Sequence, residues 1–176
     1  MPTHEVTNQP PPLAGYDAAD DPALVAAVEA FRPVSPEGSD GPEGSDDTAM
    51  SAAGLRALGR LAGGEHAQEQ GRLANENPPK LRTHDRYGHR VDEVEFHPAW
   101  HDLMNSAIAH GLHAAPWRDA RPGAHLDRAA RFYVWGQAEA GHLCPVSMTY
   151  AIVPALRHAP DLARRYEPLL ASTAYD

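Results

Sequence analysis

The residues best suited to metal chemistry in this sequence are two histidines one helical turn apart. His97 and His101 have the spacing at which two side chains on one helix face can hold a metal ion. A zinc protease motif would also need a glutamate directly after the first histidine, and Pro98 stands there instead. Pro98 favours His97 as a helix-capping residue. Because no third ligand lies at a suitable spacing, we predict no metal site.

The single cysteine, Cys144, is the second candidate for chemistry. A cysteine just before a helix can act as a nucleophile when a base is positioned beside it. His142 is only two residues away, and side chains at that spacing on one element do not face each other. We therefore expect Cys144 to pack as a small hydrophobic residue. A lone cysteine also excludes an internal disulfide.

Hydroxyls and carboxylates supply the remaining candidates. Ser147, Met148 and Thr149 could present two hydroxyls and a thioether to a ligand, or the hydroxyls could bond back to the carbonyl four residues earlier. Spacing does not separate these alternatives. Glu95 and Glu139 have no partner at a recognisable spacing, and the chain lacks both glycine-rich phosphate-binding motifs. From the residues alone we assign no catalytic residue.

The composition indicates a globular chain with an acidic balance. The sequence has 176 residues, 42% of them hydrophobic, and a formal net charge of -9. This length and composition fit one domain with a core. The negative charge argues against a phosphate-binding surface like that of nucleic-acid binders, which gather lysine and arginine on one face. Neither a long apolar run nor a secretory signal is present, so we expect a cytoplasmic protein without membrane contact.

The N-terminal part of the chain contains two segments that do not read as helices. Residues 1–20 are rich in proline, which excludes a helix and favours an extended arm. Residues 33–48 contain "PEGSD" twice and almost no apolar side chain, so we expect a disordered insert. Between them, Asp21 is a good N-cap and Pro22 suits the first position of a helix.

Helical periodicity returns after the insert and continues to the end of the chain. Pro154 should kink or end its helix, because its ring meets the carbonyl of Tyr150. Strand patterns are weak, and "HRVDEVEFH" alternates imperfectly. The sequence thus predicts an all-α bundle with one long irregular connection. The further helices are expected over residues 48–61, 65–75, 98–112, 124–141, 145–157 and 161–170.

Three long stretches carry a resemblance to a known family. They read "THEVTNQPPPL", "GRLANENPPKLRTHDRYGHRVDEVEFHPAWH" and "AARFYVWGQAEAGHLCPVSMTYAIVPAL". They occur in the same order in the AidB-type branch of the acyl-CoA dehydrogenase superfamily, which the terminal "STAYD" also resembles. The resemblance covers nearly all of the chain apart from the insert.

This resemblance implies a part of a larger flavoprotein. Members of the branch are homotetramers that bind FAD, are linked to the adaptive response to DNA alkylation and can bind double-stranded DNA. Each subunit has an N-terminal helical domain, a middle β-domain and a C-terminal helical domain. Residues 21–176 resemble the first of these, and we expect the other two to be absent or separately encoded as partners. We expect the chain alone to be inactive, without FAD and without the DNA-binding regions.

The resemblance also suggests roles for two segments. The last helices of this domain wall the acyl pocket beside the flavin, so Ser147, Met148 and Thr149 become candidates for facing that cavity. The stretch from Gly71 to His101 is expected to be architectural, with a turn at Tyr87-Gly88 and contacts to neighbouring domains or subunits. The alternative to a flavoprotein domain is a stand-alone helical interaction module without catalysis.

Overall fold

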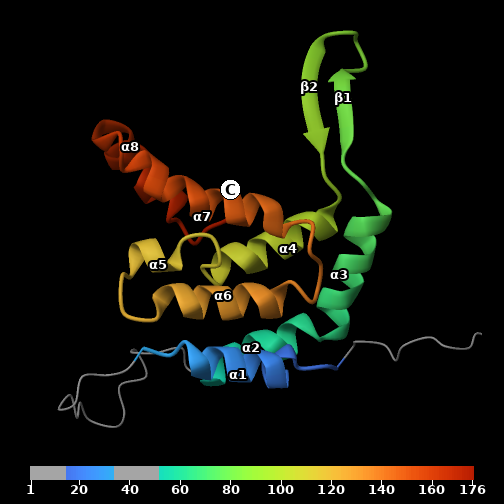
Figure 1. The fold of residues 1–176 in the computed structure, drawn as a ribbon. Coiled ribbons are helices and arrows are strands. Elements are labelled where there is room, and N and C mark those ends of the chain that lie inside the picture. The colour runs from blue at the N-terminus through green and yellow to red at the C-terminus, as the bar shows by residue number, and fades with distance from the viewer. Residues whose placement is uncertain (1–14, 34–51) are drawn as a thin grey trace, which may run out of the picture.

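The computed structural model describes residues 15–33 and 52–176 (Figure 1). Within these ranges, no helix combines the length and the apolar character that crossing a membrane requires. The elements are η1 (Ala18–Asp20), α1 (Pro22–Ala30), α2 (Ala52–Ala62), α3 (Glu65–Glu76), β1 (Lys80–His84), β2 (Arg90–Glu95), α4 (Pro98–Ala109), α5 (Ala115–Arg118), α6 (Ala124–Trp135), α7 (Leu143–Leu156) and α8 (Pro160–Leu170). The predicted all-α bundle is confirmed.

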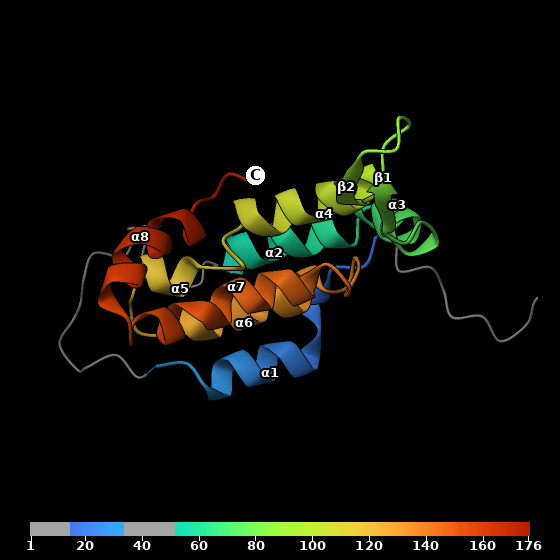
Figure 2. The ribbon, with the colours of Figure 1, turned by 90° about the horizontal axis from the view of Figure 1, so that it is seen from above.

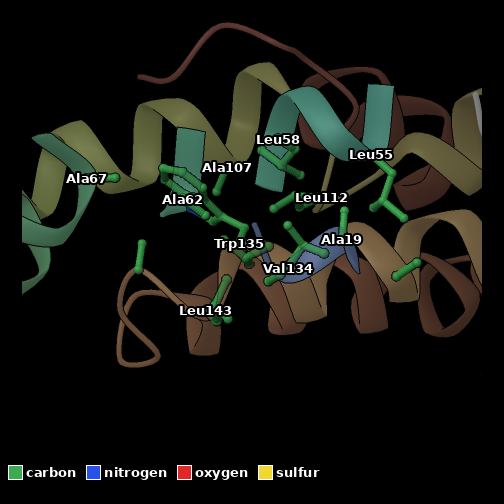
Figure 3. Close-up of a cluster of buried hydrophobic side chains, with 14 of the residues drawn as sticks. Ala19, Leu55, Leu58, Ala62, Ala67, Ala107, Leu112, Val134, Trp135 and Leu143 are labelled. Carbon is green, nitrogen blue, oxygen red and sulfur yellow. The ribbon is translucent and has the colours of Figure 1, made fainter. Parts of the chain in front are cut away.

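The core lies where α2, α4 and α6 meet the first turn of α7. Figure 3 shows Trp135 of α6 at its centre, with Leu58 of α2 on one side and Leu143 of α7 on the other. Alanines such as Ala62 and Ala107, both 0% exposed, let the helices approach closely. Burial of this apolar surface stabilises the fold by roughly 25 cal/mol for each Å² removed from water.

Two helix starts follow the sequence prediction in detail. The side chain of Asp21 accepts hydrogen bonds from the backbone N–H groups of Ala23 and Leu24, and Pro22 occupies the first turn. These bonds lower the pKa of Asp21 below its usual value. At α4, His97 is the N-cap, and its Nδ1 accepts a hydrogen bond of 3.2 Å from the N–H of Ala99. The capping role predicted for His97 is therefore confirmed.

The expected irregular connection contains a β-hairpin instead. Strands β1 and β2 pair antiparallel, with Leu81 opposite Val94 and an irregularity in register between Arg82 and His84. All residues of both strands are exposed, so no buried face imposes an alternation of polar and apolar residues that the sequence could reveal. The turn falls near the predicted position and includes Gly88 at φ +87°.

The predicted N-terminal arm and insert lie largely outside the described residues. Residues 1–14 and 34–51 are not described, so the insert over 33–48 and most of the arm over 1–20 stay predictions. The end of the arm differs from an extended chain, because Ala18 and Ala19 form part of η1 and are buried against the bundle. Asp17 caps this turn through a 3.0 Å bond from the N–H of Ala19.

Candidate functional site

Helix α7 presents one face to the bundle and the other to solvent. In Figure 1 it lies above α4, which it contacts. Val146 and Val153 point inward and are 0% and 2% exposed, whereas Met148 and Ile152 are 67% and 40% exposed. Cys144 is also exposed, so its predicted packing as a small hydrophobic residue is wrong. An apolar sequence on both sides of a helix does not reveal which side is covered.

The three candidate residues on α7 have different surroundings. Thr149 donates its hydroxyl to the carbonyl of Pro145 at 3.0 Å, which is one of the two alternatives left open by the sequence. Ser147 is half-buried, and its hydroxyl has no hydrogen-bond partner within residues 15–33 and 52–176. Met148 is exposed. That these residues face a cavity stays a prediction.

The C-terminal half of α7 is held by a tryptophan from the neighbouring α5. Pro154 lies inside α7 and cannot donate a hydrogen bond to the carbonyl of Tyr150. The indole Nε1 of Trp117 donates to that carbonyl at 2.9 Å. The helix continues only two residues beyond Pro154, to Leu156. The proline therefore ends the helix nearby, as predicted, and α5 satisfies the group that it leaves free.

Aromatic rings and one arginine form a packed cluster beneath this part of α7. The rings of Trp117 and Tyr150 stack with centroids 5.1 Å apart. The guanidinium of Arg128 lies 4.2 Å from the ring centroid of Tyr150 and 4.2 Å from that of Phe132. The hydroxyl of Tyr150 also lies 2.6 Å from Nδ1 of His125. These contacts fix the orientation of α7 relative to α6.

A buried pair of ionisable side chains lies at the N-terminal end of α7. Nδ1 of His142 lies 2.9 Å from Oε2 of Glu139, and the two side chains are 0% and 7% exposed. The carboxylate also accepts the backbone N–H groups of Gly141 and His142. Glu139 is thus not an isolated carboxylate, and neither is Glu95, which accepts a hydrogen bond from Arg82. The three-residue spacing of Glu139 and His142 was the signal for this pair.

The protonation of this pair follows from its burial and hydrogen bonds. Burial lowers the pKa of His142, and its bonds to Glu139 offset only part of that effect. Burial alone would raise the pKa of Glu139, but the hydrogen bonds from His142 and Gly141 lower it below the usual value. The pair therefore holds an ionised carboxylate and a neutral imidazole near neutral pH. With Nδ1 engaged by Glu139, the imidazole of His142 can accept a further proton at its free Nε2.

A cavity of about 500 Å³ lies beside this pair, at the base of the hairpin. The stacked rings of Phe96 and Trp100, 4.1 Å apart, form one wall. Nε2 of His142 is buried and has no hydrogen-bond partner in the part of the chain that the structure describes. The other lining residues are Ala74, Asn75, Pro78, Pro79, Glu139, Gly141 and Pro145.

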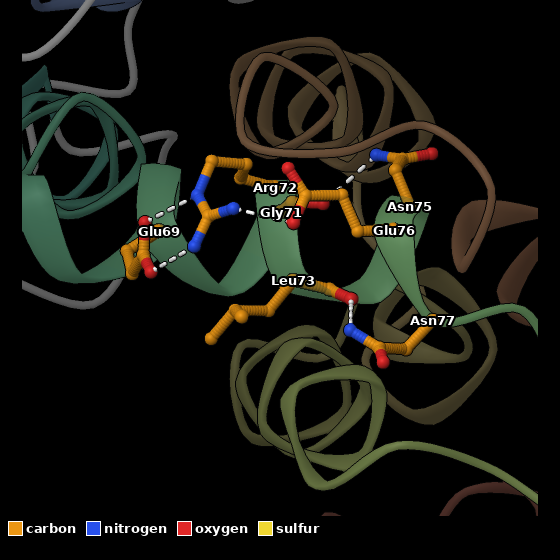
Figure 4. Close-up of polar contacts among 7 residues, drawn as sticks. All are labelled: Glu69, Gly71, Arg72, Leu73, Asn75, Glu76 and Asn77. Carbon is orange, nitrogen blue, oxygen red and sulfur yellow. Dashed lines mark hydrogen bonds and ion pairs between the residues drawn. The ribbon is translucent and has the colours of Figure 1, made fainter.

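Helix α3 supports this cavity through polar contacts within the helix (Figure 4). Asn75 donates its side-chain N–H to the carbonyl of Gly71, and Asn77 donates to the carbonyl of Leu73. The bond from Asn77 closes the helix just before the two prolines that line the cavity. Arg72 forms ion pairs with Glu69 and Glu76, but such exposed pairs contribute only about 0–1 kcal/mol each.

The two histidines considered for metal binding have other partners. Nδ1 of His97 serves the helix cap, and Nδ1 of His101 lies 2.7 Å from the hydroxyl of Tyr175. Among the described residues, no three histidine, cysteine, aspartate or glutamate side chains gather as a group that could hold a metal ion.

Two solved structures share this fold. The chain superposes on Bd2924 in its apo form with a TM-score of 0.73 and 24% identity, covering 88% of this chain and 29% of that one. It superposes on ACDH-11 of Caenorhabditis elegans, solved in complex with C11-CoA, with a TM-score of 0.73 and 21% identity, covering 98% and 29%. The described fold therefore also occurs as one part of longer chains, because each match covers 29% of the solved protein.

The sequence places the chain within one protein family. Residues 8–176 match the family described as the adaptive response protein AidB N-terminal domain. The chain is also 42% identical over 177 residues to AidB of Escherichia coli (strain K12), whose name assigns it to the acyl-CoA dehydrogenases. It therefore belongs to the AidB N-terminal domain family. The match covers 99% of this chain and 30% of that relative.

Proposed function

We propose that this chain serves as the N-terminal helical domain of an AidB-type flavoprotein linked to the response to DNA alkylation. The observation that carries the proposal is the family match over residues 8–176, because it spans the whole described fold. The middle and C-terminal domains would be supplied by further polypeptide, and the assembled protein would be a cytoplasmic tetramer. DNA would bind through regions outside this chain, which by itself would be inactive.

The exposed face of α7 supports a place for this domain in the acyl pocket. Cys144, Met148 and Ile152 recur at intervals of four residues and are exposed, so they form one apolar stripe. Exposure of an apolar stripe to water costs free energy, and contact with another apolar surface is therefore favoured. We infer that the stripe forms a wall for the acyl chain. Ser147 beside it offers an unpartnered hydroxyl to a ligand.

The residues present fit one wall of a flavin pocket, and they do not form a complete cradle. When bound in an enzyme of this type, FAD supplies the hydride acceptor. Holding it also requires donors to its diphosphate, and the stripe on α7 contains only a thiol, a thioether and an aliphatic side chain. This chain would therefore exclude water from one side of the pocket. The groups that grip the cofactor would come from the other domains.

The hairpin is proposed as a contact to a neighbouring domain or subunit. Leu81, Tyr87 and Val94 are 64%, 74% and 53% exposed. A two-stranded hairpin with both faces in water is marginally stable by itself. A neighbouring surface that covers these side chains would stabilise it.

A chimera tests the proposed role. This chain would replace the matched segment of Escherichia coli AidB, and retention of FAD through gel filtration would be measured. We expect the chimera to retain flavin and this chain alone to remain colourless. Met148→Glu should reduce flavin retention or thioester turnover in the chimera, because it places a charge in the apolar wall. The matched control is Phe31→Glu. Phe31 is 75% exposed and directly follows α1, and α1 and α7 lie on opposite sides of the bundle (Figure 1).

The opposite results would contradict the proposal. A chimera that folds without flavin, while AidB itself retains it, would favour the stand-alone interaction module. Equal effects of Met148→Glu and Phe31→Glu would mean that α7 does not form part of the pocket wall. Stoichiometric flavin on the isolated chain would overturn the proposed division between domains.

A further inference from the structure

A second cavity, on the bundle end opposite the hairpin, is lined by an unusual density of arginine. It has a volume of about 200 Å³ and lies where α5 and α6 follow the end of α4 (Figure 2). It is independent of the α7 stripe and of the cavity beside His142. Its charged lining consists of Arg118, Arg121, Arg128, Arg131, Asp119 and Asp127.

The two aspartates neutralise two of the four arginines. Asp127, whose side chain is 12% exposed, accepts a 2.9 Å bond from Nη2 of Arg121 and a 2.8 Å bond from Nε of Arg131. Asp119 lies 3.2 Å from Nε of Arg121. The lining therefore keeps an excess of two positive charges, in a chain whose formal net charge is -9. The whole-chain charge does not predict this local cluster.

Arg128 is the partly buried one of the two arginines that no aspartate neutralises. Its Nε donates to the carbonyl of Leu112 at 2.8 Å. The guanidinium also packs against the rings of Phe132 and Tyr150. Its Nη2 is buried and has no acceptor within the described ranges. Burial lowers the pKa of Arg128, because the charge is separated from water. A donor on a cation without an acceptor is costly, so an anion in the cavity that Arg128 lines would be favoured.

Arg118 is the exposed one of the two arginines that no aspartate neutralises. Its only described hydrogen bond is a long one of 3.4 Å from Nη1 to the carbonyl of Ala171. The remaining N–H groups of its guanidinium are available to a ligand. Arg118 and Arg128 thus line one small space, Arg128 held by its bond to Leu112 and by two rings and Arg118 exposed with one long hydrogen bond.

We propose that this cavity binds the dianionic phosphate of a small phosphomonoester. Two unneutralised guanidiniums match two negative charges, and planar guanidinium forks match the geometry of phosphate oxygens. A carboxylate or a phosphodiester carries one negative charge and would leave one arginine unneutralised. A volume of about 200 Å³ accommodates a phosphate group with part of its ester substituent, and not a large ligand.

Calorimetric titration of the full 176-residue chain tests the site. The probes are methyl phosphate, inorganic phosphate, dimethyl phosphate and acetate, at low salt and at a pH of about 7.5, where phosphomonoesters are mostly dianions. We expect methyl phosphate and inorganic phosphate to bind with a Kd on the order of 1 mM or below. Dimethyl phosphate and acetate should bind about tenfold more weakly or not at all.

Three variants locate the binding. Arg118→Gln should weaken phosphate binding about tenfold, and Arg128→Lys should do so as well, since lysine keeps the charge without the fork. Arg86→Gln, on the exposed hairpin, removes the same charge elsewhere and should leave binding unchanged. Circular dichroism reports whether each variant folds, and Arg118→Gln decides the result if Arg128→Lys does not fold. The proposal is overturned if the native chain does not bind phosphate, if acetate binds equally well, or if Arg118→Gln and Arg86→Gln have equal effects.

Discussion

Helices α4 and α7 are adjacent, but they use their apolar side chains differently. On α4 the apolar residues form one stripe that is covered, so that Leu103 is 1% exposed and Ala107 is 0% exposed. On α7 the inward side chain of Val146 is equally buried, while Met148 on the outer face is 67% exposed. The neighbouring α8 has no buried residue at all among those described.

This difference contrasts an apolar surface that the described fold covers with one that it leaves exposed. The covered stripe of α4 has the helical period expected when one face meets a core. A helix that is apolar on more than one side is expected to be central in its protein. In this chain α7 lies at the edge of the described fold, and Met148 and Ile152 on its outer face are exposed. The chain spans 30% of the length of its Escherichia coli relative.

The largest effect should come from truncating the covered stripe. Leu103→Ala should lower the free energy of unfolding by about 2–5 kcal/mol, because it removes buried apolar surface and leaves a cavity. Met148→Ala should change it by no more than about 0.5 kcal/mol in the isolated chain. Urea denaturation followed by circular dichroism measures both. A loss at Met148 as large as that at Leu103 would show that α7 is already covered, by self-association for example, and would remove the contrast.

A close approach between α3 and the loop before α7 gives the next effect. Gly71 is buried, and a Cβ atom there would lie 2.2 Å from the carbonyl oxygen of Ala138. Helix propensity alone predicts that Gly71→Ala stabilises the protein by about 1 kcal/mol. We expect the steric contact to dominate and the variant to lose about 1–3 kcal/mol. The sign of the change in a thermal melt decides between the two.

The sequence predicted best those elements whose signals are local. Asp21 with Pro22, and His97 with Pro98, marked helix starts because the capping contacts lie within three residues. The hairpin was missed because both faces are exposed. The bond between His101 and Tyr175 joins residues 74 positions apart, and the cavity arginines come together only through the turn after α5. Such sites depend on packing, which spacing along one element cannot show.

The contact between Trp117 and α7 should have a smaller effect. Trp117→Phe removes the donor to the carbonyl of Tyr150 and should cost about 1 kcal/mol. Pro154→Ala restores a backbone N–H that can bond the same carbonyl. The loss caused by Trp117→Phe should therefore shrink in the Pro154→Ala background, and a double-mutant cycle measures this coupling. Additive effects would mean that the indole acts through packing alone. Trp100→Phe, which removes the same ring area without this bond, is the matched control.

The smallest effect is the loss of stability in acid that two buried histidines cause. Burial lowers the pKa of His142 and that of His113, which is 2% exposed, so each stays neutral in the folded chain at a pH where the unfolded chain binds a proton. Proton uptake by the unfolded state then makes stability fall as the pH drops below about 6.5. Measurements above a pH of about 5 avoid most of the change in stability that protonation of carboxylates would cause, because the usual pKa values of these groups lie near 4.

Substitution of each histidine shows which end of the bundle senses acid. His142→Gln keeps a donor for Glu139 at the start of α7, and His113→Gln keeps a donor for the carbonyl of Ser172, which the ring contacts at 2.8 Å. Each variant should show a shallower fall in melting temperature between pH of about 7.5 and 5 than the parent chain, and the double variant the shallowest. If only His142→Gln flattens the curve, acid acts at the α6–α7 connection. If neither does, burial of these rings does not control the response.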